Sequence, residues 1–174
     1  MSLSIPQDLF PALSAALVQL RQVLAKGEAH AQAQSWDPAV LLNMRLAPDM
    51  FPLVRQVQIA TDIVKNAAAR LSGGEPPKFE DTETTFAELD ARIGRALDYV
   101  ASVAPGAFDG GESRQIVLPS RAYGELHFDG RSYIFGFVIP NVYFHATTAY
   151  ALLRHAGVPL GKADFLGPIG QKKD

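Results

Sequence analysis

Four long segments of the chain repeat apolar residues at intervals of three and four positions. They span approximately residues 6–26, 49–71, 86–104 and 141–155. This spacing places the apolar side chains on one face of an α-helix, so the sequence predicts four amphipathic helices. We expect Gly27 to end the first helix, because glycine commonly follows a helix C-terminus. Gly94 lies inside the third segment, where it would allow a neighbouring helix to approach closely.

The sequence between the third and fourth helices follows a different pattern. Residues 110–140 are rich in β-branched and aromatic side chains and contain several turn signals. Residues 126–128, the pair Asp129-Gly130 and residues 131–135 form the pattern of a β-hairpin with a tight turn. Residues 116–119 would precede it as an extended segment. About 30 residues cannot bury a core of their own, so we interpret this region as a small hairpin insertion before the last long helix.

These elements predict an all-α fold, a four-helix bundle with one small β-hairpin. The 174 residues suit a single domain over residues 1–170, and residues 171–174 form a tail. A short helix is expected at residues 39–44 and a loop at residues 160–170. The long connections at residues 27–47 and 105–140 leave open a topology other than simple up-and-down.

Composition narrows the chemistry that the chain can perform. It has no cysteine, four histidines and a formal net charge of −2. The absence of cysteine excludes disulfides, thiol nucleophiles and cysteine-ligated metals, and the near-neutral charge gives no electrostatic signal for nucleic acid. The first residues lack the pattern of a signal peptide, and no apolar run reaches the length of about 20 residues that spans a bilayer. We therefore expect a cytoplasmic protein that binds neither nucleic acid nor membrane.

Polar residues interrupt the apolar faces of the second and fourth predicted helices. Asn141, His145 and Thr148 lie on the apolar face of the fourth, and Asp49 and Gln56 share one flank of the apolar face of the second. If these helices pack side by side, the five side chains converge near one end of the bundle, where bundles build ligand and metal sites. The other interpretation is structural: a histidine satisfied in the core, together with residues that cap helices.

The remaining histidines supply no second metal ligand. His155 follows His145 by ten residues, which is about 15 Å along a helix, and we place His30 in a loop and His127 in the hairpin. No Walker loop, nucleophile elbow, zinc-protease or dinucleotide motif occurs. Aromatic residues crowd the hairpin and the start of the fourth helix, which indicates either core packing or a homodimer interface.

Two segments of the chain resemble a known family. They are residues 45–60, which contain RLAPDMFPL and QVQIA, and residues 140–154, PNVYFHATTAYALLR, followed by Gly157 and residues 161–167. Both are similar to the signature of the bacterial domain-of-unknown-function family numbered nineteen ninety-three, which is itself similar to the DinB/YfiT-like superfamily. The resemblance covers nearly the whole chain, and it implies a four-helix bundle that is often a homodimer.

The same resemblance allows the metal ligands to be compared. Many superfamily members bind a divalent metal with one histidine on the second helix and a His-x-x-x-His pair on the fourth, and some are thiol-dependent transferases or isomerases. Here Asn141 replaces the first histidine of the pair, His145 keeps the second, and Gln56 or Asp49 stands on the second helix. One imidazole with amides and one carboxylate is a poor zinc or nickel site. We therefore predict no cofactor; if a divalent metal binds, its ligands are His145, Asp49 and Gln56.

Three functions remain open, of which one is enzymatic. The first is a bundle that has lost the metal and binds a small polar ligand in its pocket. The second is a metal-dependent DinB-like transferase or isomerase with a degenerate site. The third is a structural or interaction protein that acts as a homodimer. The candidate pocket residues are Asp49, Gln56, Asn141, His145 and Thr148.

Overall fold

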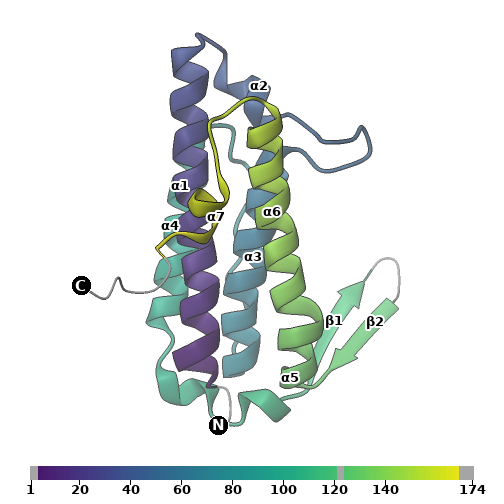
Figure 1. The fold of residues 1–174 in the computed structure, drawn as a ribbon. Coiled ribbons are helices and arrows are strands. Elements are labelled where there is room, and N and C mark those ends of the chain that lie inside the picture. The colour runs from purple at the N-terminus through teal and green to yellow at the C-terminus, as the bar shows by residue number, and fades with distance from the viewer. Residues whose placement is uncertain (1–3, 121–123, 169–174) are drawn as a thin grey trace, which may run out of the picture.

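The computed structural model describes residues 4–120 and 124–168, which form a bundle of four long helices (Figure 1). The long helices are α1 (Phe10–Ala33), α3 (Leu53–Ser72), α4 (Phe86–Ser102) and α6 (Ile139–His155). The shorter elements are α2 (Pro38–Leu42), α5 (Gly130–Tyr133), α7 (Lys162–Leu166) and an antiparallel pair, β1 (Ile116–Ser120) and β2 (Gly124–Phe128). The predicted fold class, a helical bundle with a hairpin before the last long helix, is confirmed.

Helix α3 lies at the centre of the packing. It packs most extensively against α6 and α4, and α1 also packs against both of these helices. Figure 1 shows α3 and α6 side by side, as the predicted polar site requires. The core is formed mainly by aliphatic side chains, among which Leu17, Val57, Val64 and Leu89 are fully buried. Within the described residues, none of the helices combines the length and the apolarity of a membrane span.

Helix α1 is longer than predicted, because Gly27 lies inside it rather than after it. A Cβ atom at position 27 would lie 2.9 Å from Cδ2 of Leu153 on α6. The glycine therefore serves a close approach between two helices, which was the role predicted for Gly94. That prediction was wrong, because a Cβ at position 94 meets nothing within 4 Å. The extension of α1 also places His30 on a helix, where its ring lies edge-on to Trp36.

Two helices begin with a wide π-helical turn just before a proline. The amide of Phe10 donates to the carbonyl of Ile5 ahead of Pro11, and the amide of Ile139 donates to that of Ile134 ahead of Pro140. A proline ring clashes with the carbonyl four residues earlier, and a widened turn relieves that clash. The turn at Ile134–Val138 joins α5 to α6, so the last long helix continues back to residue 130.

The hairpin lies earlier in the chain than predicted. Residues 131–135 are helical rather than extended, and β2 pairs with β1, matching Ile116 with Phe128. Asp129 begins a helix, since its carboxylate accepts a hydrogen bond from the amide of Ser132 at 2.6 Å. A Cβ at Gly130 would collide with the carbonyl of Gly111, so this glycine serves a close backbone contact. The pair Asp-Gly occurs both in hairpin turns and at helix starts. Here the helix forms because it buries the apolar residues that follow.

Other boundaries differ by a few residues. Helix α3 begins after Pro52 rather than near residue 49, and α2 covers residues 38–42 rather than 39–44. Helix α4 begins with a capping box, in which the Thr85 hydroxyl accepts from the amide of Glu88 and the Glu88 carboxylate accepts from that of Thr85. Residues 162–166 form α7 where a loop was expected. The predicted tail at 171–174 lies outside the described residues.

Candidate functional site

Two of the predicted site residues meet between α3 and α6. Gln56 lies in the first turn of α3, and His145 lies in the middle of α6. Their side chains are joined by a hydrogen bond of 2.7 Å between Nδ1 of His145 and Oε1 of Gln56. Both are buried, with 1% of Gln56 and 8% of His145 exposed. The pair is therefore fixed in the wall of the bundle, with a small part of the imidazole open to solvent.

The backbone before α3 determines how this pair is polarised. Nε2 of Gln56 donates a hydrogen bond of 2.9 Å to the carbonyl of Phe51. Because a carbonyl only accepts, the amide nitrogen of Gln56 must face Phe51 and its oxygen must face His145. Nδ1 of His145 is then the donor and carries the proton. In a neutral imidazole this leaves the lone pair on Nε2.

The electrostatic surroundings keep this imidazole neutral. Burial lowers the pKa of His145 below its ordinary value, and the positive charge of Arg55 lowers that pKa further. Nε2 makes no hydrogen bond within the part of the chain that the structure describes. At neutral pH His145 thus presents one unpaired acceptor, held in a single tautomer by Gln56.

The other three predicted pocket residues do not join this pair. The Asn141 amide donates to the carbonyl of Phe137 at 2.7 Å, and the Thr148 hydroxyl donates to that of Phe144 at 2.7 Å. Each of these short side chains therefore makes its hydrogen bond to the backbone carbonyl four residues earlier in the same helical segment. Asp49 lies in an exposed turn before α3 rather than on the helix. The convergence of five side chains predicted from helical periodicity is reduced to a contact between two.

The residues at this position do not fit a transition-metal centre. Both ends of the Gln56 amide and Nδ1 of His145 are already used in hydrogen bonds. Nε2 of His145 is thus the one strong ligand atom that this pair offers, whereas zinc sites use three or four protein ligands. Across residues 4–120 and 124–168, no group of three histidine, aspartate or glutamate side chains lies close enough to hold a metal ion.

Aromatic side chains border the pair on its solvent side. The ring of Phe144 lies edge-on to His145 with 5.1 Å between centroids, and 57% of Phe144 is exposed. Phe51, whose carbonyl accepts from Gln56, is 53% exposed, and the guanidinium of Arg55 lies 6.0 Å from its ring centre. An exposed aromatic side chain therefore lies against the His145 ring.

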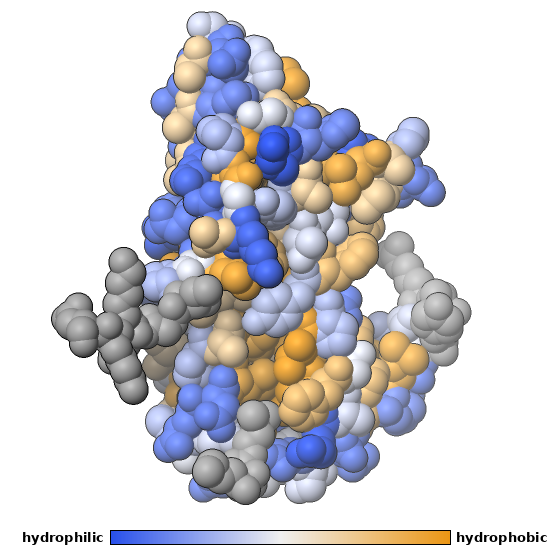
Figure 2. All heavy atoms as spheres, in the orientation of Figure 1, coloured by the Kyte–Doolittle hydropathy of each residue, from blue (hydrophilic) through white to orange (hydrophobic). Residues whose placement is uncertain are grey.

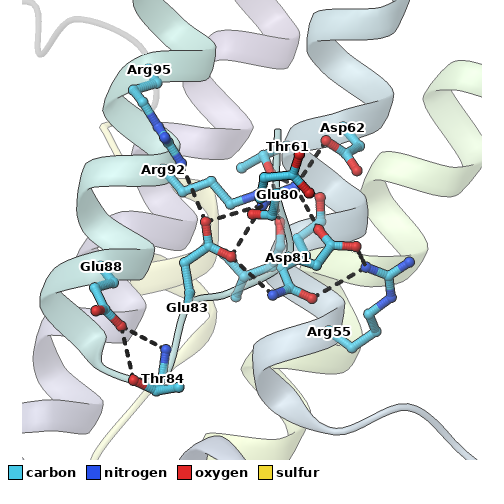
Figure 3. A network of polar contacts seen from close by, with 12 residues as sticks. Arg55, Thr61, Asp62, Glu80, Asp81, Glu83, Thr84, Glu88, Arg92 and Arg95 are labelled. Atoms are coloured by element: carbon cyan, nitrogen blue, oxygen red, sulfur yellow. Dashed lines mark hydrogen bonds and ion pairs between the residues drawn. The ribbon is translucent and has the colours of Figure 1, made fainter. Parts of the chain in front are cut away.

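A second polar cluster was missed by the sequence analysis. Arg92 on α4 is fully buried, and all three of its guanidinium nitrogens make contacts (Figure 3). Its partners are the Thr61 hydroxyl at 2.8 Å, the Glu80 carbonyl at 3.0 Å, and the carboxylates of Asp62, Asp81 and Glu83 at 2.9, 3.1 and 3.1 Å. The spacing of Arg92 from Leu89 and Ala96 places it on the apolar face of α4, and this was the available signal.

This cluster is closed, with each carboxylate shared between two cations. Lys65 also contacts Asp62, Arg55 also contacts Asp81, and Arg95 also contacts Glu83. Figure 3 shows that the carboxylates at 81 and 83 come from the loop between α3 and α4. The cluster therefore anchors that loop to both helices. Through Asp81 it also holds Arg55 next to the Gln56–His145 pair.

Comparisons with known proteins agree with this architecture. Residues 7–166 match the family described as "Domain of unknown function (DUF1993)". The fold is similar to the crystal structure of a DinB family member protein from Shewanella denitrificans, with 42% sequence identity and a TM-score of 0.87. That match covers 95% of this chain and 93% of the other. No curated protein matches the chain.

Proposed function

Because the chain belongs to the DUF1993 family and shares the fold of a DinB family member, we propose that it is a metal-independent member of this group that binds a small ligand at His145. The proposed ligand is a neutral molecule that donates an O–H or N–H to Nε2 of His145 and carries an apolar body. The observation that supports this proposal is the Gln56–His145 hydrogen bond, which leaves Nε2 as an oriented acceptor.

The surroundings of the acceptor favour this class of ligand over others. The positive charge of Arg55, which helps to keep His145 neutral, disfavours a cationic ligand. Arg55 is itself paired with Asp81, which weakens its effect on charged ligands of either sign, so it does not select for an anion. Exposed Phe51 and Phe144 supply apolar contact area for the body of the ligand.

Phenol is a suitable probe, because it combines one neutral donor with an aromatic ring. We expect its titration to shift amide resonances around residues 51–56 and 144–148 in a saturable manner. His145→Phe keeps the volume of a ring but removes the acceptor, and it should weaken binding about tenfold, the usual effect of one buried hydrogen bond. His155→Phe changes an exposed histidine on the same helix and should leave binding unchanged. Equal affinity of wild type and His145→Phe would contradict the proposal.

The metal-dependent alternative is tested on untagged protein from cells grown with zinc, nickel and manganese. The proposal expects no stoichiometric metal by elemental analysis. A metal present at one equivalent and lost in His145→Phe would instead support a degenerate metal centre, with a transferase or isomerase as the function to pursue.

Self-association is a second candidate function, supported by the exposed apolar residues near the same site. Apolar side chains lie on the loop between α2 and α3, which projects from the bundle (Figure 1; Figure 2). That loop carries Leu46 and Phe51, and Phe144 is exposed on α6. Aromatic residues of this kind are enriched in homodimer interfaces. Sedimentation equilibrium of the wild type and of Phe144→Ser tests this candidate: a dimer should dissociate in the variant, and a monomeric wild type would exclude it.

A further inference from the structure

A cavity lies at the far end of α3 from the Gln56–His145 pair. Gln56 and Arg70 are separated by 14 residues, which is about 21 Å along the helix. This cavity has a volume of about 500 Å³ and lies between the C-terminal end of α3 and the segment leading into β1. Its lining includes Arg70, Gly73, Glu75 and Arg114. In Figure 1 the hairpin lies beside the lower part of the bundle, at the level where α3 ends.

Two guanidinium groups line this cavity without a carboxylate partner. Neither Arg70 nor Arg114 forms an ion pair with any residue in the described ranges, although seven other Lys and Arg side chains do. Arg70 donates to the hydroxyl of the buried Tyr133 at 3.0 Å, which holds the guanidinium in place. Among the described residues, the guanidinium of Arg114 has one hydrogen-bond partner, the carbonyl of Asp109 at 3.4 Å.

Arg114 has a donor that its protein surroundings leave unused. Its Nε is buried and has no hydrogen-bond partner among the residues that the structure describes. Gly73, which ends α3 in a left-handed conformation, lies directly against this guanidinium, and a Cβ at position 73 would collide with it. The glycine thus permits Arg114 to lie over the end of the helix. A buried donor without a partner is costly. Nη1 of Arg114 is also unpaired within the described residues but is not buried, so it is the donor that an oxygen ligand would reach.

We infer that Arg70 and Arg114 form a binding site for a small oxyanion, the carboxylate or phosphate end of a small molecule. Guanidinium groups present several N–H donors in one plane, which match the oxygens of such an anion. The two positive charges outweigh the negative C-terminal end of α3 and the single carboxylate of Glu75, which is exposed and forms no ion pair with either arginine. This site is independent of the ligand proposed at His145.

The test uses inorganic phosphate and acetate as probes on the full chain, with ionic strength held constant by sodium chloride. Binding is followed by amide chemical shifts and calorimetry. We expect saturable binding of at least one probe, with shifts around residues 70–75 and 114–117. Arg70→Gln and Arg114→Gln should each weaken it about tenfold, since each removes a charge-assisted contact. Arg154→Gln changes an exposed arginine on α6 and serves as the matched control, with unchanged affinity expected.

Glu75→Gln provides a test that misfolding cannot imitate. Removing the exposed carboxylate from the cavity should strengthen binding about twofold, the range of a solvent-screened charge interaction. The preference between phosphate and acetate identifies the form of the oxyanion. Two results would overturn the inference: no saturable binding of either probe, or equal binding by the two arginine variants and the wild type.

Discussion

Arg92 offers the sharpest test of how the bundle holds its α3–α4 loop. Its guanidinium is fully buried and faces the carboxylates of Asp62, Asp81 and Glu83. Replacing it with methionine keeps most of the side-chain volume but leaves the nearly buried carboxylate of Glu83 without its main partner. Breaking a buried ion pair in this way typically costs about 3–5 kcal/mol, a large share of the total stability of about 5–15 kcal/mol expected for a domain.

Urea unfolding followed by circular dichroism measures this effect. With a slope of about 2 kcal/mol per molar urea, a loss of about 4 kcal/mol lowers the midpoint by about 2 M. Arg21→Met is the control, because it breaks an ion pair with Asp90 in which both side chains are substantially exposed, and surface pairs contribute little. Its midpoint should stay close to that of the wild type.

The double variant Arg92→Met/Glu83→Met distinguishes two effects: loss of the attraction between Arg92 and Glu83, and the cost of leaving the Glu83 charge buried without Arg92. Removing Glu83 as well takes away the most buried carboxylate that Arg92 had neutralised, which Arg95 alone would otherwise have to balance, so the double variant should be less than additively destabilised. An unfolding midpoint of Arg92→Met within about 0.5 M urea of the wild type would show that the buried guanidinium does not stabilise the fold in this way. Additive losses would show that the Arg92–Glu83 pair is not coupled.

The remaining predictions concern the helices and the pH dependence of folding. Gly94→Ala should raise the melting temperature by about 2–4 °C, because alanine favours an open helical site by about 1 kcal/mol. Gly27→Ala should lower it, because the new methyl group meets buried Leu153. Thr85→Ala should cost about 1 kcal/mol in urea unfolding through loss of the α4 cap. Since the pKa of His145 is lowered in the folded state, the unfolded chain binds more protons below its ordinary pKa. Stability should therefore fall as the pH drops through the ordinary histidine pKa of about 6.5, more steeply in the wild type than in His145→Gln; parallel pH profiles would argue against this.

The helices were predictable because each buries a regular apolar face. The errors arose where one residue type serves two purposes. Gly27 resembles a helix stop but permits close packing, and Asp129 before Gly130 resembles a hairpin turn but caps a helix. In each case a tertiary contact determines which of the two structures forms, and such a contact cannot be predicted from the neighbouring residues in the sequence.

The candidate site, like the helices, was predictable only where helical periodicity determines which way a side chain faces. Gln56 and His145 lie on packing faces whose orientation follows from periodicity, so their meeting could be expected once α3 and α6 were neighbours. The hydrogen bonds of Asn141 and Thr148 to their own helix could not be distinguished from contacts across the bundle. The Arg92 cluster depends on carboxylates from a loop. Because a loop has no hydrophobic periodicity, the sequence pattern could not identify these partners.

The tautomer and charge of the His145 imidazole decide whether its Nε2 can act as an acceptor. A long-range proton–nitrogen NMR spectrum of histidine-labelled protein near neutral pH distinguishes the tautomers. We expect a neutral ring with the proton on Nδ1 and an unprotonated Nε2, and loss of this fixed state in Gln56→Leu. A proton on Nε2, or a charged imidazolium at neutral pH, would contradict the central claim that Gln56 holds His145 as an oriented acceptor.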